Sequence, residues 1–190
     1  GGHGAADKNH IGKIYRIAAK GFKPKKAASE STEELLASPA HNVRFTGFEK
    51  LRAEGSPALP KIKKLLKSDS PWLVGRAIWI LPYLGEKGIA ELMKVPSTIG
   101  KQDYRFRAVA LRSALRFDPK NLGWSMMEEL RKDKSAHVRR IILTHLRDVP
   151  YNKKKSILMD LILSGDLEDR TYLESIGLAA DGDEDSLWSE

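Results

Sequence analysis

The chain contains no cysteine, and this absence excludes several chemistries at once. Without thiols the chain has no disulfide, no thiolate metal site, no cysteine nucleophile and no haem attached through a C-x-x-C-H motif. It also lacks a run of about 18 apolar residues and a signal segment at its start. Phosphate-binding loops, dinucleotide-binding glycine patterns and serine-nucleophile motifs are missing as well. We therefore expect no catalytic residue, no cofactor site and no metal site in this chain.

Positive and negative charges are unevenly distributed along the sequence. Residues 1–165 hold 32 of the 33 Lys and Arg residues and 16 of the 25 Asp and Glu residues, a net charge of +16. Residues 166–190 hold one base and nine acids, a net charge of −8. A basic body attracts anionic partners, whereas an acidic end repels the same ligand locally. Solvated helix faces are the simpler explanation of both.

A helical pattern recurs from His41 onward with a period of about 31 to 34 residues, which is typical of helix-turn-helix solenoids. Each unit has Arg near the start of its first helix and Leu near its end. We expect these first helices at 42–51, 72–84, 104–115, 137–146 and 169–178. One register is marked by Leu51, Leu81, Leu115, Leu146 and Leu178.

Turn residues separate the two helices of each unit, at 54–57, 85–88, 117–119 and 148–150. Glycine commonly ends a helix and proline commonly starts one. Apolar residues at three- and four-residue steps then indicate second helices around 62–66, 89–93, 122–130 and 157–162. The sequence predicts an all-α fold, a HEAT-like or armadillo-type α-solenoid (an α-α superhelix) of about five helix pairs.

The two ends of the chain differ from this repeat. Residues 11–17 are rich in β-branched and aromatic side chains, which suits a strand, but the chain offers no partner strand. We expect an N-terminal segment at 1–28, with the last strand of a preceding sheet and a linker, and the solenoid at 29–190. A short helix within 29–38 ends before Pro39. Because Leu187 and Trp188 predict another helix, we expect the solenoid to continue past Glu190.

Two sets of segments carry a resemblance to a known family. The first set comprises 2–7 (GHGAAD), 10–18 (HIGKIYRIA) and 20–25 (KGFKPK). The second comprises 103–108 (DYRFRA), 137–140 (HVRR), 146–150 (LRDVP), 168–177 (EDRTYLESIG) and 180–182 (ADG). These segments resemble the large multidomain dehydrogenase-like proteins of planctomycete and verrucomicrobial bacteria. In that family a quinoprotein-type propeller precedes HEAT-like repeats and a cytochrome c domain.

The resemblance implies a function for the parent protein. Its propeller resembles that of pyrroloquinoline-quinone-dependent sugar dehydrogenases, so the parent would oxidise a sugar or alcohol and pass electrons to haem c. Residues 1–28 would contain the last propeller strand, and the location would be periplasmic or at the cell surface. Two departures limit this inference: Ala19 stands where relatives often have Pro, and the haem-binding cysteine motif is absent. Activity is therefore not carried over to this chain.

Several titratable residues are candidate ligands for a metal ion. His137 and His145 lie eight residues apart in one expected helix, about 12 Å along its axis, too far for one metal ion. His3 and His10 flank Asp7, in either a ligand-binding loop or a plain connection. The carboxylates of 181–185 alternate as in calcium loops, but Ser186 occupies the place where an EF-hand needs Gly. A solvated turn between helices is the better interpretation.

Basic residues on the second helices form the candidate binding surface, because such helices line the concave face of HEAT stacks. We expect a basic groove made of Lys61, Lys63, Lys64, Lys67, Lys94, Arg131, Lys132, Lys134, Lys153, Lys154 and Lys155. It would hold an acidic protein, an acidic polysaccharide or nucleic acid. Trp72, Trp79 and Trp124 have helical core spacing, so we expect them to pack in the core rather than stack on bases.

These observations favour a non-catalytic HEAT-repeat module for protein interaction and spacing. It would hold the propeller and the electron-accepting domain of a larger dehydrogenase apart, and its partners would be those domains and an electron-transfer protein. The alternative is a solenoid that binds nucleic acid or another polyanion through the basic groove.

Overall fold

The structure is a computed structural model of the 190-residue chain, and it describes residues 20–21, 31–165 and 168–189. Residues 1–30 and 31–190 form separate units, and the following description concerns the second. The strand expected at 11–17, and His3, Asp7 and His10, lie outside the described residues.

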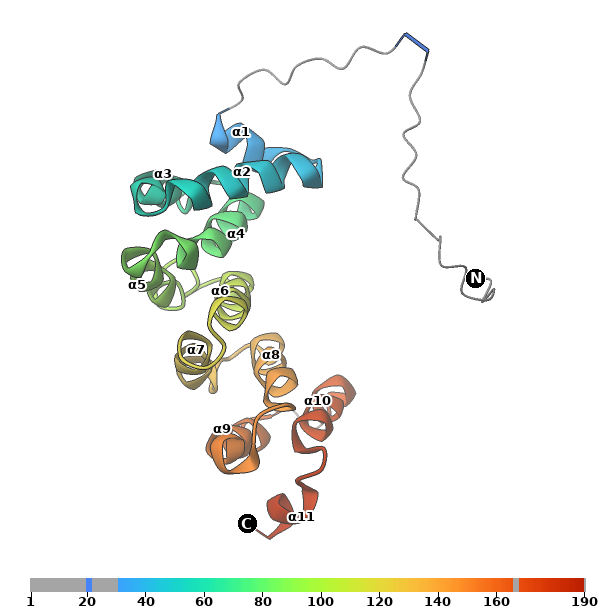
Figure 1. Cartoon of the computed structure of the whole chain (residues 1–190). Coiled ribbons are helices and arrows are strands. Elements are labelled where there is room, and N and C mark those ends of the chain that lie inside the picture. Colours follow the sequence, from blue (N-terminus) through green and yellow to red (C-terminus); the bar gives the residue numbers. More distant parts are fainter. Residues whose placement is uncertain (1–19, 22–30, 166–167, 190) are drawn as a thin grey trace, which may run out of the picture. The chain divides into compact units, whose positions relative to one another are not determined.

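The described part of the second unit consists of helices and contains no strand, so it is all-α as the sequence predicts (Figure 1). One layer, called layer A, contains α2 (His41–Glu54), α4 (Pro71–Ile80), α6 (Tyr104–Phe117), α8 (Ala136–Leu146) and α10 (Arg170–Ala180). The other, layer B, contains α3 (Leu59–Leu65), α5 (Glu86–Lys94), α7 (Leu122–Leu130) and α9 (Tyr151–Leu163). The shorter elements are α1 (Thr32–Ala37), α11 (Glu184–Trp188) and the 3-10 turns η1 (Ser56–Ala58) and η2 (Leu81–Leu84).

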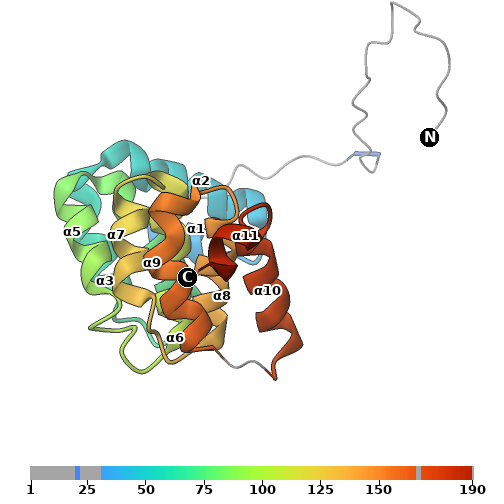
Figure 2. The ribbon, with the colours of Figure 1, turned by 90° about the horizontal axis from the view of Figure 1, so that it is seen from below.

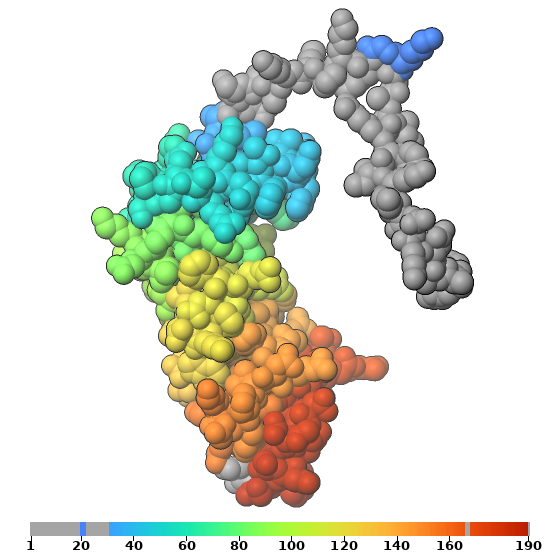
Figure 3. Space-filling model, in the orientation of Figure 1, coloured from blue at the N-terminus to red at the C-terminus, as the bar shows by residue number. Residues whose placement is uncertain are grey.

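Helices pack in chain order within this unit. In layer A, α4 contacts α2 and α6, and α8 contacts α6 and α10. In layer B, α7 contacts α6 and α8, and α9 contacts α8 and α10, while α3 contacts α4 and α5 contacts α6. Seen from below, α3, α5, α7 and α9 lie on one side of the unit (Figure 2). The colours of the space-filling view therefore follow one another in order from α1 to α11 (Figure 3).

A continuous apolar core lies between the two layers. Layer A contributes fully buried side chains such as Ile78, Leu111 and Ile142, and layer B contributes Ile62 and Leu158. Buried positions recur at three- and four-residue steps in the helices of layers A and B, which gives each of these helices one buried stripe. Because one pair cannot cover its own apolar faces, each pair is covered by the next.

Turn residues end the helices where the sequence predicts, and one first helix ends early. Gly55 and Gly85 have φ values of +64° and +77°, so they turn the chain after α2 and η2 at little steric cost. The first helix expected at 72–84 instead ends at Ile80 and continues as η2. Pro82 explains this difference, because proline has no backbone N–H to continue the α-helical bonding.

One side chain expected in the core and one leucine of the repeat register are exposed. Trp72, expected to pack, is 76% exposed, and Leu178, which marks the fifth repeat, is 44% exposed. Trp72 and Trp79 are seven residues apart and so share a face of α4, but the core stripe of that helix is Val74, Ala77 and Ile78. The helical spacing predicted from the sequence is therefore correct, but the face of α4 that was expected to meet the core is wrong. In α10 the buried side chains include Ala179 and Ala180, and Leu178 lies outside this buried set.

A chain of polar side chains crosses the unit at the starts of the layer A helices. Arg107 of α6 forms a bidentate ion pair with Asp133, with Nε–Oδ2 and Nη2–Oδ1 distances of 2.5 and 2.8 Å. Arg139 of α8 donates to the Asp133 carbonyl and to the Tyr172 hydroxyl of α10. The Tyr172 hydroxyl in turn donates to the Leu161 carbonyl of α9 at 2.8 Å. Successive helix pairs are thus joined by hydrogen bonds as well as by apolar contact.

Candidate binding groove

Most of the basic residues expected to form a groove lie in ion pairs with nearby carboxylates. The pairs are Lys61–Glu54, Lys63–Glu91, Lys94–Glu91, Lys64–Glu33, Arg131–Asp160 and Lys132–Asp160, with N···O distances between 2.7 and 3.5 Å. Hydrogen bonds from Lys63 and Lys94 hold the pKa of Glu91 below its usual value, so this carboxylate stays charged at neutral pH. These ion pairs reduce the positive potential of layer B.

The other predicted groove residues have different surroundings. Lys154 is buried, with 1% of its side chain exposed, and its Nζ lies 2.7 Å from Asp183 Oδ2. This residue is therefore not available on an open surface. Lys67, Lys134 and Lys153 are exposed, and Lys155 is half-buried and has an interaction partner.

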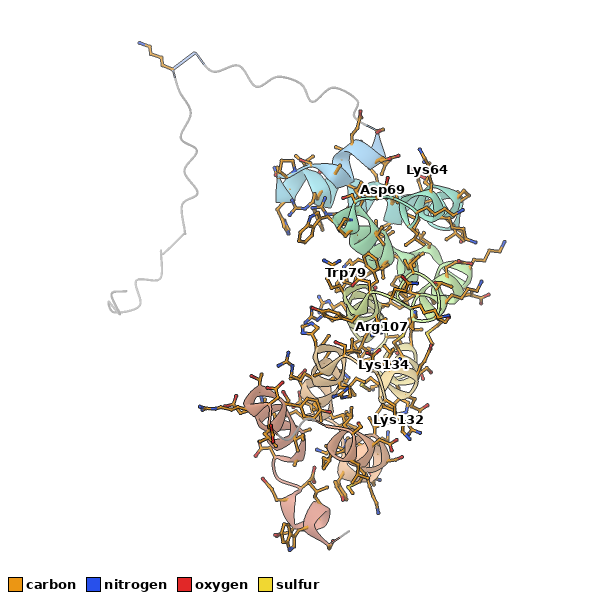
Figure 4. All side chains as sticks on the ribbon, turned by 180° about the vertical axis from the view of Figure 1, so that it is seen from behind. Lys64, Asp69, Trp79, Arg107, Lys132 and Lys134 are labelled. Atoms are coloured by element: carbon orange, nitrogen blue, oxygen red, sulfur yellow. The ribbon has the colours of Figure 1, made fainter. Side chains whose placement is uncertain are left out.

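A cavity lies between helices of layer A, away from these basic residues. A groove of about 500 Å³ opens between α2, α4 and α6. Its walls are mainly aromatic and aliphatic, with Phe45 and Phe48 from α2, Trp72 and Trp79 from α4, and Phe106 from α6. Phe45 and Trp72 are among the most exposed large apolar side chains of the described residues. Figure 4 shows Trp79 on the opposite side of the unit from Lys64 and Lys132, so the groove is separate from the predicted basic surface.

Two arginines of this groove have no carboxylate partner among the described residues. Arg44 donates through Nη1 to the carbonyls of Ser38 and Pro39, at 3.1 and 2.5 Å. Arg76 donates through Nη1 to the carbonyl of Leu36 at the end of α1. Burial, followed by the positive charge of Arg44, lowers the pKa of Arg76. Both guanidinium groups are held in place by backbone oxygens while their positive charges repel each other.

The third arginine of the groove, Arg105, is paired. It forms hydrogen bonds to both carboxylate oxygens of Asp103, which caps α6 by accepting from the Arg105 backbone N–H. These bonds lower the pKa of Asp103. Asp103 is not part of the groove wall, and no Asp or Glu is found among the described residues that line it.

The described residues form no arrangement suited to metal binding. No group of three or more His, Asp and Glu side chains lies close enough to hold an ion in this part of the chain. His137 of α8 packs edge-on against Tyr104, with ring centroids 5.8 Å apart. Within 181–185, Asp183 pairs with Lys154, and Gly182 has a φ of +77° where the chain turns from α10 to α11. None of the described helices has the length and apolarity to span a membrane.

Comparisons with family models, curated proteins and solved structures gave no significant match to this chain.

The groove was missed in the sequence because its residues come from three helices that are about 30 residues apart. Two signals were present in the sequence. The first helices of the repeats are rich in Arg, and α6 carries four arginines and no acid. The seven-residue step from Trp72 to Trp79 also places both rings on one face. Combined, these two patterns indicate an aromatic and basic face on layer A.

Proposed function

We propose that residues 31–190 act as a non-catalytic module for protein interaction and spacing, built as a HEAT-like α-solenoid. The observation that supports this most is the packing of successive helix pairs in chain order around one continuous core. In such an array each pair depends mainly on its neighbours, so its ends are held at a fixed separation and its sides offer a long surface to partners.

The proposed setting is a larger quinoprotein-type dehydrogenase that passes electrons to a cytochrome c domain, at the periplasmic side of the membrane or at the cell surface. This part of the proposal depends on the sequence resemblance alone. The module itself would contribute no catalytic residue. Its role would be to separate two domains and to dock an electron-transfer protein.

A polyanion-binding solenoid is the competing function. The exposed Trp72 favours it, because aromatic rings next to arginines also stack on the bases of single-stranded nucleic acid. Against it, six of the basic residues that would follow a phosphate backbone are paired with carboxylates at the surface, and Lys154 is buried.

Binding across a salt series separates these functions. The purified chain would be titrated with a c-type cytochrome, an acidic polysaccharide, duplex DNA and single-stranded DNA. A variant with Lys67, Lys134 and Lys153 replaced by Gln tests whether the exposed basic residues contribute. We expect cytochrome binding and no tight nucleic-acid binding. Tight DNA binding with a steep salt dependence, weakened in the triple variant, would establish the polyanion function instead.

A further inference from the structure

The groove between α2, α4 and α6 has two features that protein surfaces seldom combine: exposed aromatic rings and arginines without an acidic partner among the described residues. Its walls expose aromatic rings, above all Trp72, which is 76% exposed. When a partner covers aromatic side chains, their apolar surface is removed from water, and this favours binding. An exposed cluster of aromatic rings therefore marks an interaction site.

The second feature is the unbalanced charge. Arg44 and Arg76 lie in the groove without a carboxylate partner among the described residues, and each is fixed by backbone carbonyls. Two other partly buried arginines of layer A do have acidic partners, as Arg107 has Asp133 and Arg140 has Asp169. A bound carboxylate would relieve the repulsion between Arg44 and Arg76 and would accept hydrogen bonds from guanidinium groups that are already in place.

We propose that this groove docks an acidic protein segment. An aromatic or aliphatic side chain of the segment enters between Phe45, Trp72 and Phe106, and neighbouring carboxylates pair with Arg44 and Arg76. The proposal deepens the protein-interaction role proposed above and rests on it.

A protein segment fits the groove better than a nucleic acid does. Single-stranded nucleic acids need a positively charged track along several phosphates, with bases stacked on successive rings. Here only two guanidinium groups without a carboxylate partner among the described residues, those of Arg44 and Arg76, line a cavity with mainly apolar walls. One apolar anchor with carboxylates beside it matches that arrangement, and Arg and Trp are the residues that most often dominate protein interfaces.

The test uses a peptide of the required chemistry and the full chain. A dye-labelled peptide copied from residues 181–189 serves as the probe, because it carries four carboxylates next to Leu187 and Trp188. Its binding is followed by fluorescence anisotropy. We expect saturable binding that weakens about tenfold or more in Trp72→Ala and in Arg76→Gln. Leu163→Ala and Arg116→Gln, which change exposed residues outside both the groove and the segment copied in the probe, are the matched controls and should bind as the unchanged chain does.

Three comparisons make the result decisive. Trp72 is exposed, so its removal leaves the fold intact, whereas Arg76→Gln also loses the bond to Leu36 and needs circular dichroism beside it. A peptide with amides in place of its carboxylates, or with Ala in place of its Leu and Trp, should bind at least about tenfold more weakly. Equal binding by the Trp72→Ala chain, or displacement of the peptide by single-stranded DNA, would overturn the proposal. Cytochrome binding that persists in Trp72→Ala and Arg76→Gln would leave the spacer function standing without this groove.

Discussion

Single residues decide how the acidic end of the chain attaches to the basic body. Lys154 of α9 is almost completely buried, and its only carboxylate partner among the described residues is Asp183, which is 28% exposed. The sequence alone predicts Lys154 in an open basic groove, because it lies on a second helix and such helices line the concave face of HEAT stacks. In the structure the three consecutive lysines at 153–155 point in different directions around α9, so the middle one points inward.

Removing Asp183 should destabilise the unit far more than removing its neighbour Asp185. Asp183→Ala leaves a buried ammonium group without a partner, and we expect a loss of about 3 kcal/mol in the free energy of unfolding. Asp185→Ala, in the same turn but exposed, should cost less than about 1 kcal/mol. Urea denaturation measures both. Equal losses would show that the ion pair does not hold α11 to α9.

Protonation of two histidines should make the unit less stable in mild acid. Burial lowers the pKa of His137 and of His145 below the usual 6.5; Arg112 and Arg140 lower the former further, while Asp148 acts against the shift of the latter. Because both pKa values are lower in the folded state, the unfolded chain binds more protons near pH 6, and stability falls as the pH drops.

The measurement is the urea midpoint at several values between about pH 7.5 and pH 5.5, a window above the titration of the carboxylates. In the variant with His137 and His145 both replaced by Gln, the midpoint should change less over this window. The slope of the midpoint against pH is compared rather than the absolute stability, since Gln differs from His in shape and packing. An unchanged slope would show that other groups cause the pH dependence.

At the scale of helices, the sequence predicted much of the fold because helix periods and turn residues are local signals. The stripe of α7, with Met126 and Leu130 buried, and the turn at Asp118 could both be read from the chain alone. When apolar residues lie on several sides of a helix, the sequence alone does not show which side meets the core. For this reason Trp72, beside Leu73 and Val74 at the start of α4, was assigned to the core and lies outside it.

Close packing between η2 and α5 explains one glycine. A methyl group at Gly88 would lie 2.1 Å from the carbonyl oxygen of Leu81, so Gly88→Ala should cost about 1 to 3 kcal/mol. Gly177 of α10 has no atom within 4 Å of that position, and Gly177→Ala should add about 0.5 to 1 kcal/mol because alanine favours the helix. Thermal melts of both variants check this. A gain in stability for Gly88→Ala would contradict the contact between η2 and α5.

At the scale of the whole unit, the candidate site could not be predicted because its chemistry depends on contacts between distant residues. Lys63 is neutralised by Glu91, and Arg76 lies near Arg44, about 30 residues away in each case. The sequence shows how many charges each helix carries, but pairing depends on which helices become neighbours. The net charge of +16 over residues 1–165 thus predicts that the chain attracts anions, but it does not predict where on the surface they bind.

The proposed spacer role requires that the helix pairs keep a fixed separation along the unit. The absence of cysteine allows this to be measured cleanly, because cysteines introduced at Lys50 of α2 and Leu178 of α10 would be the only two in the chain. Both positions are exposed, so spin labels there should not disturb the core. Pulsed electron paramagnetic resonance then gives the distribution of distances between the labels. We expect one narrow peak at the separation of these positions in the structure, unchanged when a cytochrome is added. A broad distribution, or two peaks, would contradict a stack that acts as a spacer.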